Sequence, residues 1–152
     1  MRVGRLGSPE LIALAGALLL VIGLFLPWYE TDPTNRNASL AGTRGSVSAF
    51  QAEPVLSWLL LALALAPLIL AWIAVREHQL SWPRGEMTAV LAMIGFVLVV
   101  YVGVIARPGQ PAGAISLGIG WYLAALGCIL ECAGGAIRAG STERPRKPPG
   151  VL

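Results

Sequence analysis

The sequence predicts an all-α integral membrane protein, an antiparallel four-helix bundle, on three observations. First, four apolar runs of about twenty residues occupy about residues 10–29, 54–75, 87–106 and 114–138, and a helix of that length crosses ~30 Å of hydrocarbon. Second, charged residues make up 12% of the 152 residues and the mean hydropathy is +0.71, which is too apolar for a soluble domain. Third, no run alternates as a membrane barrel strand does, so each run is expected to be helical.

The first run begins with residues that favour a helix start and ends at aromatic residues. Ser8 suits a helix cap, and Glu10 favours the positive end of the helix dipole. Pro27 ends the run, and Trp28 and Tyr29 are expected to anchor the span at the membrane interface. A basic start before an apolar run also describes a signal peptide. Because no small-x-small cleavage site follows the run, we interpret it as an uncleaved anchor.

The hydrophilic segments divide the chain into one membrane domain and a tail. Segment 30–53 is the longest of them and is expected to form an outer loop. Gly42 and Gly45 bracket a turn in this loop, between flanks that alternate loosely, which is compatible with a short β-hairpin. Segment 140–152 is polar, basic and rich in proline, and is expected to be a disordered cytoplasmic tail. The four-span transmembrane domain is therefore expected to occupy residues 1–139.

Three further tryptophans are expected to be interface anchors in the second run and after it. Trp58 and Trp72 lie fourteen residues apart, roughly 21 Å along a helix, so they can mark the two membrane surfaces. Trp82 belongs to the connection that follows. Pro67 lies inside the second run, where it removes a backbone donor and is expected to kink the helix.

The distribution of basic residues predicts the orientation of the spans. With the N-terminus inside, the inner segments hold eight basic residues and the outer segments three. The inner set is Arg2, Arg5, Arg76, Arg84, Arg138, Arg144, Arg146 and Lys147, and the outer set is Arg36, Arg44 and Arg107. This excess favours cytoplasmic termini in a plasma (inner) membrane, as in a bacterium. The basic residues form no compact patch, so no nucleic-acid partner is expected.

Small residues at regular spacing mark one face of the fourth run. Glycines recur there every seven residues, which keeps them on one seam of a left-handed helix pair. Close helix packing in lipid needs such small residues, and the first run offers a matching face. The expected packing seam comprises Gly113, Gly120, Ala124, Gly127, Gly134, Ala13, Gly16 and Gly23. We interpret the seam as packing within the chain, and self-association into a homo-oligomer is the alternative.

Glu131 is the one acidic residue inside the fourth run. An ionisable residue within a span is a functional-site candidate by default, here an intramembrane ion or proton site. The alternative is structural. Glu131 lies seven residues before Arg138, about 10 Å along a helix, so it can sit near the inner headgroups and pair with Arg76, Arg84 or Arg138. The depth of Glu131 and its partner distinguish the two interpretations.

Catalytic and metal-binding patterns are missing from the sequence. Cys128 and Cys132 lie four residues apart in the fourth run, and the single histidine, His78, lies in the inner loop. Tetrahedral zinc usually takes four closely placed donors, so we interpret the cysteines as small buried residues and expect neither metal nor cofactor. The chain has no P-loop, nucleophile elbow, zinc-binding helix or dinucleotide fingerprint, so an enzyme is not expected.

The first half of the chain resembles a known type of protein. A run that ends in Leu-Pro-Trp-Tyr at 26–29, Ser-Ala-Phe at 48–50, and a Leu/Ala-rich second run resemble small uncharacterised four-span bacterial membrane proteins of actinobacterial type, over residues 11–75. The resemblance implies a topology and no activity. The claudin group is similar in topology alone. Its loop signature is missing, so no junction role is carried over.

These observations predict a non-enzymatic protein that acts through packing or contact within the lipid bilayer. Its expected partner is a second copy of the chain or another membrane protein. The alternative is a small transporter, or an ion- or proton-coupled membrane protein that uses Glu131. A polar cavity at Glu131 would favour transport, and pairing at the inner surface would favour a scaffold.

Overall fold

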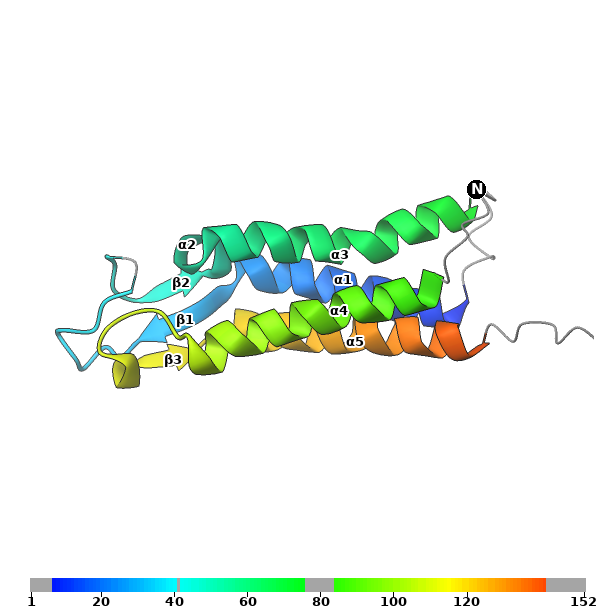
Figure 1. Ribbon diagram of the computed structural model, residues 1–152. Coiled ribbons are helices and arrows are strands. Elements are labelled where there is room, and N and C mark those ends of the chain that lie inside the picture. The colour runs from blue at the N-terminus through cyan, green and yellow to red at the C-terminus, as the bar shows by residue number, and fades with distance from the viewer. Residues whose placement is uncertain (1–6, 41, 76–83, 142–152) are drawn as a thin grey trace, which may run out of the picture.

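The computed structural model describes residues 7–40, 42–75 and 84–141 and is mostly helical. Its long helices run side by side along the molecule (Figure 1): α1 (Ser8–Phe25), α3 (Pro54–Val75), α4 (Arg84–Val100) and α5 (Ile119–Ser141). Helix α1 begins and α5 ends at the same end of the molecule, which we call the terminal end. The strands gather at the opposite end, which we call the sheet end.

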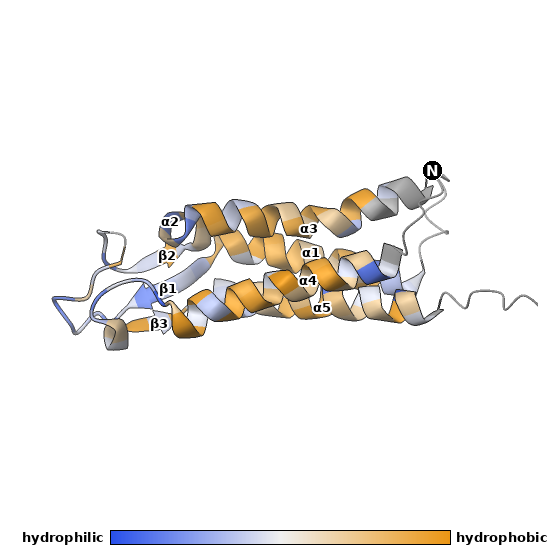
Figure 2. Ribbon diagram, viewed as in Figure 1, coloured by the Kyte–Doolittle hydropathy of each residue, from blue (hydrophilic) through white to orange (hydrophobic). Residues whose placement is uncertain are grey.

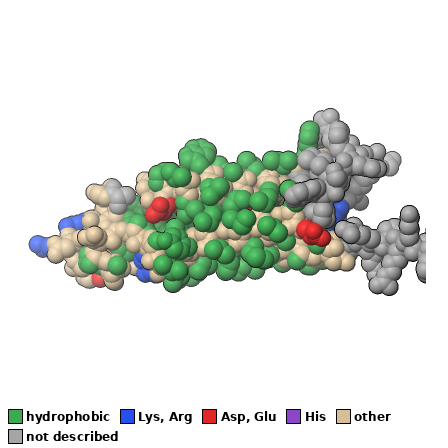
Figure 3. Space-filling model, in the orientation of Figure 1, with side chains coloured by type: hydrophobic (Ala, Val, Ile, Leu, Met, Phe, Trp, Pro, Cys, Tyr) green, Lys and Arg blue, Asp and Glu red, His purple; other side chains and the backbone are tan. Residues whose placement is uncertain are grey.

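Three stretches of the described chain are long and apolar enough to cross a membrane: Ser8–Phe25, Gly85–Ile105 and Ile119–Gly140. In α3, the described apolar stretch is Pro54–Ile69. Hydrophobic residues dominate the helices, and hydrophilic residues gather in the loops of the sheet end (Figure 2). On the face seen in Figure 3, hydrophobic side chains cover the middle of the molecule and charged side chains lie toward its two ends.

The ends of the helices differ from the predicted spans. Helix α1 ends at Phe25, because the chain turns extended at Leu26 and Pro27 opens a strand. Helix α4 continues through a π-helical turn, η2 (Tyr101–Ile105), and ends close to the predicted boundary. Helix α5 begins at Ile119 rather than at residue 114. The residues before it form a short 3₁₀ turn, η3 (Ala112–Ala114), and a strand.

The sheet end carries three short strands, which corrects the all-α prediction. They are β1 (Pro27–Thr31), β2 (Ser46–Ser48) and β3 (Ile115–Leu117), in the order β2-β1-β3 with both pairs antiparallel. In the register, Tyr29 lies opposite Val47 on one side and Leu117 on the other. The sheet joins both loops of this end to the chain that leaves α1, so its backbone groups are paired outside any helix.

The predicted hairpin in segment 30–53 is present only in part. Strand β2 pairs with β1, which begins before the segment, and the turn expected near Gly42 and Gly45 closes a single bridge between Leu40 and Thr43. Both glycines have positive φ angles, 75° and 99°, which residues with side chains rarely adopt. A helical turn, α2 (Ala49–Ala52), follows β2 and leads into α3.

Candidate functional site

Helices α1 and α5 approach so closely that several positions have no room for a side chain. A Cβ atom added to Gly127 would lie 2.6 Å from the backbone nitrogen of Leu20 and 2.7 Å from the backbone oxygen of Gly16. A Cβ atom added to Gly16 would lie 2.6 Å from the oxygen of Gly127. The two glycines therefore let the backbones touch, which is how helices gain van der Waals contact in lipid.

The same contact repeats toward both ends of the helix pair. A Cβ atom on Gly23 would lie 2.8 Å from the nitrogen of Ala124, and one on Gly134 would lie 2.7 Å from the nitrogen of Ala13. Gly120 faces the oxygen of Gly23 in the same way. Seven of the eight residues expected in the seam thus lie where α1 meets α5. We call this contact the α1–α5 seam.

Gly113 is not part of the seam, which corrects its assignment. It lies in η3, it is exposed, and a Cβ atom added there would meet no atom within 4 Å. The seven-residue spacing continues through this position, but helix α5 starts only at Ile119. A periodic pattern places a residue on a helix face only where the chain is helical.

A second close contact, between α4 and α5, was not expected from the sequence. A Cβ atom added to Gly135 would lie 2.6 Å from the nitrogen of Ala89 and 2.8 Å from the oxygen of Gly85. Gly134 and Gly135 are consecutive and lie on different faces of α5, so Gly134 contacts α1 and Gly135 contacts α4. That pair of glycines was the available signal, because two adjacent residues cannot share one helix face.

Glu131 lies in the α1–α5 seam near the middle of both helices. It is the thirteenth of the 23 residues of α5, and its neighbour Gly16 is the ninth of the 18 residues of α1. A Cβ atom added to Gly16 would lie 2.6 Å from the Glu131 nitrogen and 3.0 Å from its Cγ atom. The side chain of Glu131 therefore uses the room that Gly16 leaves free.

The Oε1 atom of Glu131 is buried without a hydrogen-bond partner in the described part of the chain. The side chain as a whole is 1% exposed. Ten residues separate it from Ser141 at the end of α5, about 15 Å along the helix. The carboxyl therefore lies in the interior of the helix pair and not at the end of α5.

For Arg138, one of the three arginines expected as partners of Glu131, the structure shows another acidic partner. Arg138 forms an ion pair with Glu10, at the terminal end where α1 begins and α5 ends. Arg76 lies outside the described residues, as do the side-chain contacts of Arg84. The structure thus separates the ion pair between the helix ends from the unpaired carboxyl deeper in the seam.

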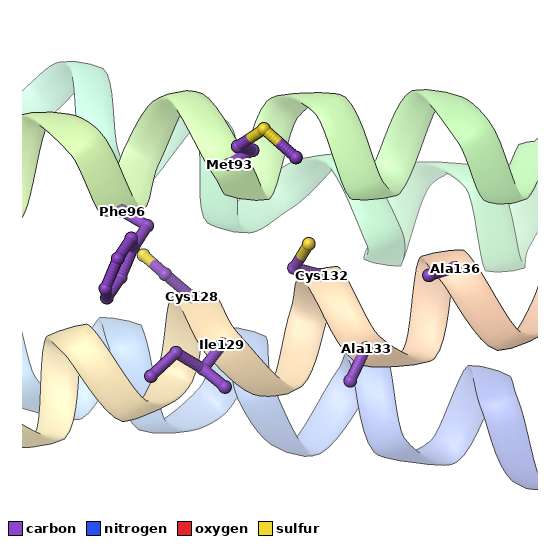
Figure 4. A pocket seen from close by; sticks show the side chains of 7 residues that line it. All are labelled: Met93, Phe96, Cys128, Ile129, Cys132, Ala133 and Ala136. Carbon is purple, nitrogen blue, oxygen red and sulfur yellow. The ribbon is translucent and has the colours of Figure 1, made fainter.

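A groove runs between α4 and α5 on the side of α5 away from the seam (Figure 4). It has a volume of about 300 Å³ and is lined by Met93, Phe96, Cys128, Ile129, Cys132, Ala133 and Ala136. Met93 and Phe96 come from α4, and the small side chains come from α5. On α5 the lining is alanine and cysteine together with Ile129, and α4 supplies the bulky side chains of Met93 and Phe96.

The two cysteines lie beside this groove as free thiols. Cys128 is buried and Cys132 is half-buried. No group of three or more histidine, cysteine, aspartate or glutamate residues gathers within residues 7–40, 42–75 and 84–141. His78 lies outside those residues, so the Cys-Cys-His combination is not described by the structure.

Trp28 and Tyr29 lie in the protein interior, which corrects their assignment as interface anchors. Both are 0% exposed, and their rings meet edge to face with centroids 6.2 Å apart. The Trp28 indole donates a hydrogen bond of 2.8 Å to the oxygen of Gly23. The sheet end covers both rings and supplies acceptors for their polar atoms, so neither ring needs the membrane interface.

The other expected anchors have different positions. Trp58 and Trp72 are 65% and 59% exposed on α3, as expected of side chains that face a membrane. Trp82 lies outside the described residues.

Three side chains at the sheet end donate hydrogen bonds to the end of α4 and to η2. Each donates to a backbone oxygen: Trp121 Nε1 to Val99 at 2.9 Å, the Tyr29 hydroxyl to Val102 at 3.1 Å, and Arg107 Nε to Gly103 at 3.0 Å. Arg107 also donates to the oxygen of Ile115 in β3, at 2.9 Å. The bonds to Val102 and Gly103 satisfy carbonyl groups that the end of η2 leaves open.

No family model, curated protein or solved structure matches the chain. The functional argument therefore rests on the seam, the buried carboxyl and the groove.

Proposed function

We propose that the chain is a non-enzymatic integral membrane protein that acts by binding a transmembrane helix of a partner protein in the groove between α4 and α5. In the proposed topology the chain crosses the plasma membrane four times, both termini lie in the cytoplasm, and the sheet end lies outside the cell. The groove carries it, because small side chains of α5 line the groove beside apolar side chains of α4. Small residues let helix backbones approach in lipid, where hydrophobicity alone does not bring helices together.

The charges support the proposed orientation. Arg36, Arg44 and Arg107 all belong to loops of the sheet end, and Arg138 lies at the terminal end. The larger set of basic residues predicted inside belongs to segments at the terminal end or to residues that the structure does not describe. Basic residues favour the cytoplasmic side, so the sheet end is expected outside.

The groove is tested with a photo-crosslinker attached to Cys132. The Cys128→Ala variant leaves Cys132 as the single thiol, and a benzophenone maleimide on it is activated in native membranes. The matched control carries the probe at Leu18→Cys in a background without Cys128 and Cys132, because Leu18 is 61% exposed on α1. We expect one protein adduct from Cys132 and lipid adducts alone from the control.

Filling the groove makes this test specific. Ala136→Trp places a large ring in the groove and is expected to remove the adduct, whereas Leu18→Trp is expected to leave it. An adduct of twice the mass of the chain would identify a second copy as the partner. Equal adducts from both probe positions, or none from Cys132, would rule out the groove as a binding surface.

A second candidate function is an ion- or proton-coupled membrane protein that uses Glu131. The observation in its favour is the buried Oε1 atom without a partner, because intramembrane ionisable groups mark ion pathways and proton relays. The test reconstitutes the chain in vesicles that contain a pH-sensitive dye and compares it with Glu131→Gln. We expect the variant to lose the pH-driven flux. Equal flux in both chains would remove this candidate.

A further inference from the structure

The buried carboxyl of Glu131 lacks a hydrogen-bond donor at Oε1 in the described part of the chain. Its Oε1 atom is buried and accepts no hydrogen bond, and the side chain is 1% exposed. An ionised carboxylate in a low-dielectric interior is strongly unfavourable unless it is paired or hydrogen-bonded. A proton or a bound cation would each neutralise it.

The residues around Glu131 do not form a metal site. Calcium takes six to eight oxygen ligands, and zinc takes four nitrogen, sulfur or oxygen ligands. No cluster of three acidic, histidine or cysteine side chains occurs in the described ranges. Gly16 contributes only backbone to the seam, and its carbonyl belongs to a helix. A proton needs no further ligand, so it is the cation that this site can hold.

Few other titratable groups lie near Glu131 in the described part of the chain. Cys128 and Cys132 flank it on α5, and helix α3 has no titratable residue between Pro54 and Val75. The remaining titratable side chains of α1, α4 and α5 lie toward the helix ends: Glu10, Arg84, Glu86, Tyr122 and Arg138. Of these, Glu10 and Arg138 contact each other. Glu131 is thus the acidic group within the middle of the α1–α5 seam.

We propose that Glu131 binds a proton inside the helix bundle, and that release of this proton to water opens the α1–α5 seam at Gly16. This inference rests on the second candidate function and names its ligand. Release leaves a carboxylate with one negative charge and transfers the proton to a water molecule. The carboxylate then requires water or a hydrogen-bond donor at Oε1.

The geometry of the seam explains why deprotonation must move the helices. The backbones of Gly16 and Gly127 are in contact, and Glu131 fills the space that Gly16 leaves. No space is left at this level of the seam for a water molecule between the two backbones. Hydration of the carboxylate therefore requires α1 and α5 to separate there. The protonated state corresponds to the closed arrangement in the structure.

Infrared spectroscopy of the full chain in lipid vesicles tests the bound proton. The carbonyl stretch of a protonated carboxylic acid differs from the bands of carboxylates, and exposed carboxyl groups are ionised at neutral pH. We expect a carboxylic acid band at neutral pH that disappears as the pH rises. Glu131→Gln keeps a neutral side chain of the same shape, so it is expected to fold and to lack this band.

Spin-label distances test the opening. Leu18 on α1 and Leu126 on α5 are 61% and 44% exposed, so labels there leave the seam intact. Both are replaced by cysteine in a chain whose Cys128 and Cys132 are alanine. We expect the distance between the labels to increase over the pH range in which the carboxylic acid band disappears. With Glu131→Gln, the distance is expected to stay constant.

The possible outcomes distinguish proton binding at Glu131 from opening of the α1–α5 seam. An infrared band that titrates without a change in the label distance overturns the opening and leaves proton binding in place. Absence of the band from the wild-type chain at neutral pH overturns both the bound proton and the opening. A distance change that tracks the band supports the inference even if vesicles show no proton flux. Because the band and the distance are both measured in chains that keep Glu131, this decision does not depend on the Glu131→Gln variant.

Discussion

At the scale of single residues, Tyr29 shows how the sheet end protects a polar group. The ring is buried beside Trp28, and its hydroxyl donates a hydrogen bond to the oxygen of Val102. Burial raises the pKa of Tyr29 above its ordinary value, the nearby Glu53 adds to the rise, and Arg107 opposes it. The side chain is therefore a neutral donor across the physiological pH range.

Tyr29→Phe is expected to lower the free energy of unfolding by about 1–3 kcal/mol, because the Val102 oxygen loses its buried donor. Unfolding of purified protein in mixed detergent micelles measures this change. The control is Tyr122→Phe, since Tyr122 is 55% exposed, and it is expected to change stability little. An equal loss in both variants would show that the Val102 bond is not responsible.

Tyr29 also predicts a dependence of stability on pH. Its pKa is raised in the folded protein, so the folded state holds the hydroxyl proton that the unfolded state loses above about pH 10. Stability from this group is therefore complete below that pH and decreases as the pH rises above it. Unfolding measured across alkaline pH should show the decrease in the wild type. Tyr29→Phe should show a smaller one.

At the scale of elements, the α1–α5 seam depends on glycine only where the helices touch. Gly127→Ala is expected to lower the free energy of unfolding by about 1–3 kcal/mol, because a Cβ atom would lie 2.6 Å from the Leu20 nitrogen. Gly113→Ala is the matched control and is expected to stay within about 0.5 kcal/mol of the wild type. Thermal unfolding of both variants in micelles decides the matter. Equal effects would contradict the seam.

The end of α4 has its own dependence on a side chain from α5. Trp121→Phe removes the indole donor to the oxygen of Val99 and is expected to cost about 1 kcal/mol of stability beyond any lost packing. Amide hydrogen exchange should rise in the residues from Val99 to Ile105. Trp58→Phe, on the exposed face of α3, should leave that exchange unchanged.

The helices could be predicted because long apolar runs depend on local composition, whereas the sheet could not. Strands β1 and β3 pair although the long helices α3 and α4 lie between them in the sequence. In addition, a strand of only three residues, Ile115 to Leu117, is too short to show the alternation by which strands are recognised. Residue type alone predicts Trp28 and Tyr29 at the membrane interface. In the structure the sheet end covers both side chains and buries them.

The candidate site was predictable in composition and only in part in geometry. The seven-residue spacing identified the glycines at the α1–α5 contact, but it extended to Gly113, because spacing alone does not show where α5 begins. The presence of Glu131 was evident from the sequence. Its depth was not, because the nearest arginine on its helix, Arg138, pairs with a glutamate of α1 instead.

At the scale of the whole molecule, the proposed topology predicts which positions reach the outside of a cell. In a chain without Cys128 and Cys132, Thr34→Cys lies in an exposed loop of the sheet end. We expect a membrane-impermeant maleimide to label it in intact cells. Gly140→Cys, at the terminal end of α5, should be labelled only after the membrane is broken. The reverse pattern would invert the orientation.

The close packing of α1 against α5 has a consequence for biosynthesis. The two helices are distant in the sequence, and α3 and α4 emerge from the ribosome between them. The glycine face of α1 therefore enters the membrane long before its match on α5 exists, and β1 likewise precedes its partner β3. Chains emerge at ~5–20 residues per second, so this surface stays uncovered for several seconds. During that interval, α1 lacks the helix that covers its glycine face in the folded chain.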